Sequence, residues 1–100
     1  MDLMLDPAAE AEIEAAAVYY QKIDERLRHD FLAEVDEAFD RILTYPHIWK
    51  CVVKHYRRLN LKRFPFAIIY ALEESIYIIA VMHERRKPNY WLRRERERKR

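Results

Sequence analysis

Two basic segments of the chain hold the side-chain types that could act on an anionic substrate. The first holds Lys54, His55, Arg57, Arg58, Lys62 and Arg63, and the second holds His83, Arg85, Arg86 and Tyr90. Cleavage of RNA through its 2′-hydroxyl needs a base, cations that stabilise the phosphorane and an acid that protonates the departing 5′-oxygen. The arginines could supply the charge, and His83 or Tyr90 could move the protons. The alternative interpretation is a solvated basic surface that binds an acidic protein.

Composition excludes several other chemistries. The 100 residues include no glycine, which excludes the glycine-rich loops of nucleotide binders and the glycine-flanked serine of hydrolases. A single cysteine, Cys51, excludes an internal disulfide and a cysteine-rich zinc site. The histidines show no close pair of metal ligands, so we expect no metal and no cofactor. The chain has no apolar run of membrane-spanning length and no secretory signal after Met1, so we expect a cytoplasmic protein without a membrane partner.

Charge is distributed unevenly along the chain, although the formal net charge is only +2. Residues 1–40 hold 12 acidic and 3 basic side chains, whereas residues 41–100 hold 5 acidic and 16 basic ones. A basic second part indicates an anionic partner, either nucleic acid or an acidic protein.

The first half has the apolar spacing of two helices. Asp6 and Pro7 are typical of a helix start, and apolar residues then recur at steps of three and four. His29 and Asp30 interrupt this stripe before a second one that ends at Pro46. We therefore expect an antiparallel helix hairpin over about 7–44, preceded by a brief edge strand at residues 2–5.

The second half favours strands. Residues 53–59, 64–72 and 76–82 are rich in strand formers, and Glu73-Glu74-Ser75 is a plausible hairpin turn. The expected fold is one α+β domain over residues 1–100. Its short N-terminal strand and helix hairpin pack on a curved, mostly antiparallel sheet of three to four strands at about 52–83, and a basic tail follows at 84–100.

The last strand is apolar on both faces. Ile76, Ile78 and Ala80 should point to one face and Tyr77, Ile79 and Val81 to the other. Because the helix hairpin can cover only one face, either the tail or another protein must cover the second. We expect a partner protein there. Tyr90 and Trp91 then either stack on a base or fasten the tail to the sheet.

Several segments together resemble the RelE/ParE superfamily of bacterial toxins. They are Ala15-Ala16-Ala17-Val18-Tyr19-Tyr20, Arg57-Arg58-Leu59, Arg63-Phe64-Pro65-Phe66-Ala67-Ile68-Ile69-Tyr70, Ala80-Val81-Met82-His83 and Pro88-Asn89-Tyr90-Trp91. The resemblance implies a toxin of a type II toxin–antitoxin system, with growth inhibition and plasmid stabilisation as its role and an acidic antitoxin as its partner. It also implies that Arg57, Arg58, Arg63, Ile79, Val81, Arg85 and Trp91 contact the antitoxin or the target.

The resemblance leaves two molecular targets open. Members similar to RelE cut messenger RNA on the ribosome, and the matching positions here are Arg57, Arg58, His83, Arg86 and Tyr90. Members similar to ParE inhibit DNA gyrase without cleaving RNA. The segment Trp49 to Lys54 has no glutamate or histidine to act as a base, and the Pro-x-Tyr-Trp ending is closer to the ParE type. We therefore expect action on gyrase, with a ribosome-dependent endoribonuclease or a non-toxic basic interaction domain as alternatives.

Overall fold

Two helices and an edge strand form the first half of the chain. The computed structural model describes residues 1–100 and begins with β1 (Leu3–Leu5), α1 (Pro7–Ile23) and α2 (Glu25–Thr44). The Asp6 carboxylate caps α1 by accepting a hydrogen bond from the Ala8 amide at 2.8 Å. The helices separate at Asp24, not at His29–Asp30 as expected. Asp24 is extended and its carboxylate caps α2 at the Arg26 amide, also at 2.8 Å.

Five strands form one mixed sheet in the order β1-β5-β4-β3-β2. The other four strands are β2 (Cys51–Val53), β3 (Tyr56–Asn60), β4 (Phe66–Leu72) and β5 (Ile76–His83). Only β1 pairs in parallel, with β5, and the remaining pairs are antiparallel. Apart from β1, the sheet has four strands, within the expected three to four, but residues 53–59 are not one strand. They contain a tight hairpin whose turn places Lys54 at φ 49°, in the left-handed region.

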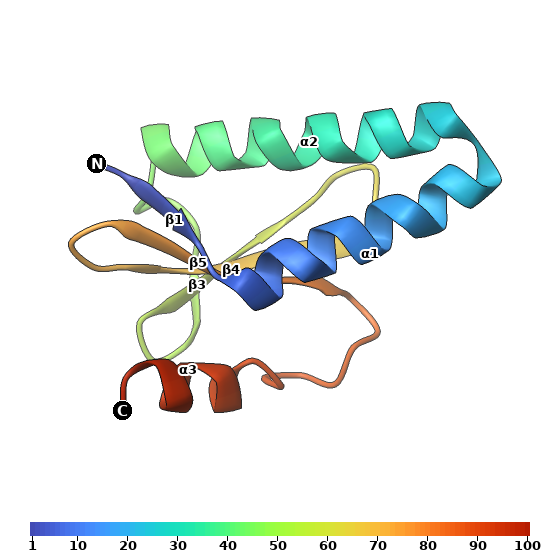
Figure 1. Ribbon diagram of the computed structural model, residues 1–100. Coiled ribbons are helices and arrows are strands. Elements are labelled where there is room, and N and C mark those ends of the chain that lie inside the picture. Colours follow the sequence, from blue (N-terminus) through green and yellow to red (C-terminus); the bar gives the residue numbers. More distant parts are fainter.

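The α1–α2 hairpin covers one face of the sheet (Figure 1). Its buried side chains are Phe31, Val35, Ala38 and Ile42 on α2 and three alanines on α1, packed on Ile68, Tyr70, Ile76 and Ile78. The small α1 residues let that helix approach β5 closely. Tyr20, Phe31, Phe64 and Phe66 meet edge to face or tilted, with ring centroids 4.9–6.4 Å apart. This aromatic cluster fixes the connection between β3 and β4 against the hairpin.

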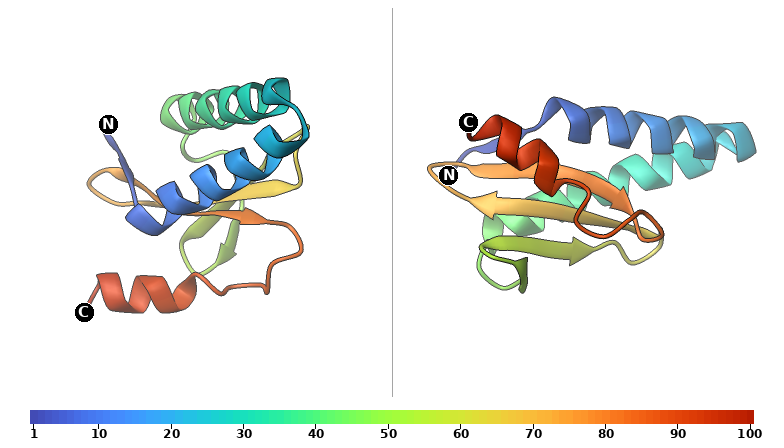
Figure 2. Two further views of the ribbon diagram at one scale, coloured as in Figure 1. Left: turned by 45° about the vertical axis from the view of Figure 1, so that its right-hand side comes forward. Right: turned by 90° about the horizontal axis from the view of Figure 1, so that it is seen from below.

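The tail covers the other face of the sheet. The short helix α3 (Leu92–Arg98) lies on the side opposite the hairpin, as both views of Figure 2 show. Trp91 is 1% exposed and packs with Tyr56, Ile69, Ala71, Ile79 and Met82 in a second core. The expected exposed apolar face is therefore absent. The prediction of a partner protein on this face is wrong, because Trp91 supplies the apolar cover that the sheet needs.

A β-bulge decides which side chains of β5 belong to which core. Ile69 of β4 pairs with Ala80, but Tyr70 pairs with Ile78, so Ile79 is an extra residue. Beyond it the alternation reverses, and Val81 rather than Ala80 joins Ile76 and Ile78 on the hairpin side. The predicted faces of Ala80 and Val81 are therefore exchanged.

Candidate functional site

The two adjacent arginines of β3 lie on opposite faces of the sheet. Arg57 is on the side of Tyr70, and its Nη1 donates to the carbonyl oxygens of His47 at 3.0 Å and Trp49 at 2.7 Å. Arg58 is on the other side, where its Nε donates to Asn60 Oδ1 at 2.8 Å. Arg57 thus braces the loop between α2 and β2, and neither guanidinium points into a shared site.

His83, Arg86 and Tyr90 come together away from these arginines. Arg58 on β3 pairs with Ile69 on β4, which pairs with Ala80 on β5, three residues before His83. Two strand spacings and three residues of strand separate the Cα atoms of Arg58 and His83 by roughly 14 Å. His83 lies on the hairpin side, with its ring 5.1 Å from that of Phe66. The Nδ1 of His83 accepts a hydrogen bond from the Arg85 amide at 3.0 Å. The five residues predicted for RNA cleavage are therefore divided, with three in one group and two elsewhere.

A glutamate of α1 organises the group. The Glu12 carboxylate accepts hydrogen bonds from the Tyr90 hydroxyl, from the Val81 amide at 3.0 Å and from Arg94 at 3.2 Å. Arg86 lies 3.7 Å away, and its guanidinium stacks 3.9 Å from the centre of the Tyr90 ring. Burial first, and then the hydrogen bond to Glu12, raise the pKa of Tyr90 far above its usual value. A tyrosine held in this way is a poor proton-transfer group near neutral pH.

The Glu12 cluster (Glu12, Arg86, Tyr90 and Arg94) also closes an open edge of the sheet. β1 pairs only with Ile76–Ile78, so the edge of β5 that faces away from β4 has no strand neighbour beyond that point. There the amide of Val81 donates to Glu12, and the carbonyl of Ile79 accepts from Arg94 at 2.7 Å. Side chains thus satisfy backbone groups that would otherwise pair with a foreign strand.

An apolar groove runs beside this cluster along α1. One hollow of about 450 Å³ is lined by Ala16, Tyr19, Tyr20, Ile23, Pro65, Phe66 and His83. A second, of about 240 Å³, shares Ala16, Phe66 and His83 with the first and extends to Glu12 and Arg86. Tyr19 and Ile23 are 63% and 61% exposed at the outer end. The α1 groove is the exposed apolar surface that lies next to the predicted basic residues.

The remaining predicted binding residues are divided between surface and core. Arg63 is exposed and forms an ion pair with Asp30 at 3.2 Å, and Arg85 is exposed without an ion pair. Ile79, Val81 and Trp91 are 0%, 1% and 1% exposed, so they offer almost no surface to a partner, although Val81 lines the smaller hollow. Their assignment to a binding surface is therefore corrected: they build the cores.

Sequence reasoning missed Glu12 and Arg94. Glu12 stands among three glutamates near the start of α1, where acidic residues are common for reasons of the helix dipole. Arg94 lies in a run of alternating charges that is typical of a solvated helix end. Their contact spans 82 residues of sequence, and no local pattern signals it. No group of three or more His, Cys, Asp or Glu side chains is placed to share a metal ion, and none of the helices is long and apolar enough to cross a bilayer.

Comparison with known proteins identifies the family. The model of the ParE toxin of the type II toxin–antitoxin system parDE matches residues 3–88, which is most of the chain. The chain belongs to the ParE toxin family. A solved structure described as the chromosomal ParDE toxin–antitoxin system from P. aeruginosa matches with a TM-score of 0.63 and 19% identity, covering 83% of this chain and 95% of that one. That likeness shows the ParE-like fold. A comparison with curated proteins gives no significant match.

Proposed function

We propose that this ParE-family toxin arrests bacterial growth by binding DNA gyrase, and that an acidic antitoxin holds it inactive in the cytoplasm. The observation that carries the proposal is the separation of the predicted catalytic residues. Arg57 is committed to two backbone carbonyls, Arg58 faces the opposite side of the sheet, and Tyr90 donates to Glu12. This arrangement favours a toxin that acts by binding over one that cleaves RNA.

The endoribonuclease alternative rests on His83 and Arg86 alone. Both line the smaller hollow, and with Nδ1 accepting a hydrogen bond the neutral imidazole carries its proton on Nε2, from which it can donate a hydrogen bond to a phosphate. Cleavage also needs a second proton-transfer group within reach of the same phosphate. Tyr90 would fill that position only if it left Glu12.

The gyrase proposal is tested by supercoiling and messenger RNA cleavage assays run with the same purified protein. We expect dose-dependent inhibition of gyrase supercoiling and intact RNA on translating ribosomes. The His83→Ala/Arg86→Ala double variant should inhibit gyrase within about threefold of the parent. If the parent protein cleaved RNA and the double variant did not, the proposal would be overturned in favour of the ribonuclease. Normal growth during expression without an antitoxin would instead support a non-toxic interaction domain.

The α1 groove is the surface that we propose for the antitoxin. It offers exposed Tyr19 and Ile23 for apolar side chains, and Arg86 at its other end for a carboxylate. A partly disordered acidic segment that folds along the groove would bury this surface and neutralise the cation.

Antitoxin affinity should therefore depend on the groove. The Tyr19→Ala/Ile23→Ser variant should weaken antitoxin binding about 30-fold or more, because two exposed apolar anchors are lost. Ile48→Ser is a matched control, since Ile48 is 65% exposed in the loop before β2, outside the groove. Isothermal titration calorimetry with the antitoxin encoded beside this gene measures both. Equal effects of the two variants would place the antitoxin elsewhere.

A further inference from the structure

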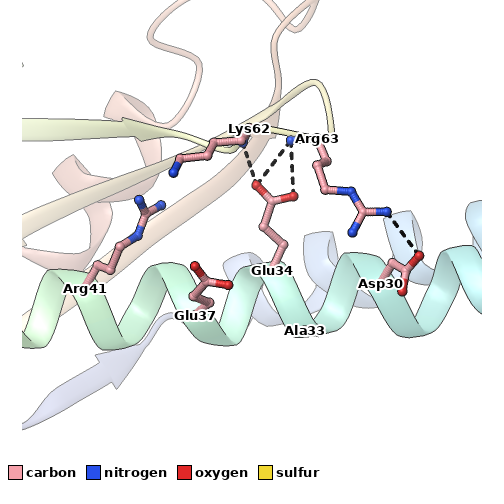
Figure 3. Close-up of a pocket in the computed structure, with 7 residues that line it drawn as sticks. All are labelled: Asp30, Ala33, Glu34, Glu37, Arg41, Lys62 and Arg63. Carbon is pink, nitrogen blue, oxygen red and sulfur yellow. Dashed lines mark hydrogen bonds and ion pairs between the residues drawn. The ribbon is translucent and has the colours of Figure 1, made fainter.

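A polar hollow of about 290 Å³ lies between α2 and the start of the β3–β4 connection, away from the groove residues (Figure 3). It is lined by Asp30, Ala33, Glu34, Glu37, Arg41, Lys62 and Arg63. Three of its six charged side chains already have partners. Arg63 pairs with Asp30 at 3.2 Å, and the Glu34 carboxylate accepts hydrogen bonds from the backbone amides of Lys62 and Arg63.

Two cations in the hollow have no such partner. Figure 3 shows the Arg41 guanidinium and the Lys62 ammonium pointing toward each other, and neither forms an ion pair. Arg41 Nε is a buried side-chain nitrogen without a hydrogen-bond partner. Buried donors are rarely left unpaired, and two like charges that face each other favour an anion between them.

Arg41 is held in place for such an anion. Its guanidinium carbon lies 5.9 Å from the centre of the Trp49 ring, so a cation–π contact limits its orientation. Arg41 is on a regular turn of α2, and Lys62 follows Leu61, which is 7% exposed. The α2 backbone holds Arg41, and the hydrogen bond from the Lys62 amide to Glu34 fixes the backbone of Lys62 beside it.

We propose that Arg41 and Lys62 bind one carboxylate side chain of an acidic peptide segment, with Glu37 as an internal competitor. The charge decides for a carboxylate over a phosphate. Asp30 pairs with Arg63 and backbone amides hold Glu34, so Arg41 and Lys62 are the cations left for an anion, in a hollow whose three carboxylates and three cations sum to zero. In a hollow that is neutral overall, a singly charged carboxylate meets less repulsion than a phosphate dianion. The proposal rests on the acidic partner proposed above and adds a second contact for it.

The test is an NMR titration of the full chain with the capped peptide acetyl-Glu-Glu-Glu-amide, without antitoxin or gyrase. We expect saturable shifts of the Arg41 Nε–H and Lys62 amide signals, and about tenfold weaker binding in Arg41→Gln and in Lys62→Gln. Glu37→Gln should bind several-fold more tightly, because it removes the competing charge. Acetyl-Gln-Gln-Gln-amide and inorganic phosphate should leave the Arg41 signal in place.

A matched control separates this site from general electrostatic attraction. Arg58→Gln removes an equal charge from the opposite face of the sheet and should leave the affinity within twofold. An equal loss in Arg58→Gln, or no gain in Glu37→Gln, would overturn the proposal. A phosphate that binds more tightly than the peptide would overturn the choice of a carboxylate. Since the titration uses only this chain and a peptide, its outcome is independent of whether the protein inhibits gyrase.

Discussion

At the scale of single residues, Glu12 joins three parts of the molecule: α1, the open edge of β5 and the tail. Its side chain is 16% exposed, and that of Arg94 is 20% exposed. Glu12→Gln keeps the shape of the side chain but removes the charge that faces Arg94 and Arg86. We expect this change to lower the free energy of unfolding by about 2–4 kcal/mol, because it leaves partly buried cations without a counter-charge. Urea denaturation followed by circular dichroism measures it.

The same substitution two residues along α1 provides the control for Glu12. Glu14 is 61% exposed and pairs with Arg28 at 3.3 Å. Glu14→Gln should change the free energy of unfolding by less than about 1 kcal/mol, since exposed ion pairs contribute little. If both variants were equally stable, Glu12 would be an ordinary surface charge and not the organiser of the cluster.

At the scale of elements, the attachment of α3 depends on pH through Glu73. Hydrogen bonds from Arg98, supported by Lys99, lower the pKa of Glu73 from its usual 4.5 to about 2. A lowered pKa in the folded state stabilises that state above pH 4.5, and the contribution disappears as the pH falls from 4.5 to 2. We therefore expect α3 to loosen over this range, which the fluorescence of Trp91 reports in a Trp49→Phe background.

Glu73→Gln isolates this contribution from the protonation of other carboxylates. The variant lacks the titrating group, so the change in its Trp91 fluorescence between pH 4.5 and 2 should be distinctly smaller than that of the parent. Near pH 7 the variant should already show part of the loosening, because Arg98 then keeps only Glu95 as an acidic partner. Identical pH profiles would mean that Glu73 does not hold α3.

At the scale of the whole molecule, one sheet supports two cores and should make them unfold together. Ile78 belongs to the core beneath the hairpin and the next residue, Ile79, to the core beneath α3, and both are 0% exposed. Ile78→Val and Ile79→Val should each destabilise the protein by about 0.5–1.5 kcal/mol. In each variant, circular dichroism of the helices and Trp91 fluorescence should report a single unfolding transition with the same urea midpoint, lower than that of the parent. Separate transitions in either variant would show that α3 and its core unfold as an independent unit.

Local patterns in the sequence sufficed for most elements and for the family. The steps of three and four residues predicted the hairpin, the apolar runs predicted β4 and β5, and the combination of segments pointed to a RelE/ParE-type toxin, with ParE as the closer type. In the candidate site, the sequence predicted only that His83, Arg86 and Tyr90 lie near one another, because these residues are close along the chain. The break at Asp24 was missed since Leu27 continues the apolar spacing of α1 across the turn.

Only the tertiary structure decided what lies on each face of the sheet. Trp91 reaches the second face through a loop whose path no periodicity encodes, and the bulge at Ile79 reverses the alternation from which the strand faces were predicted. Glu12 finds its partners 69–82 residues away, through contacts that exist only after α1 and the tail have both packed on β5. Residue spacing specifies the local conformation of the chain, whereas the pairing of distant charges depends on how the packed elements meet.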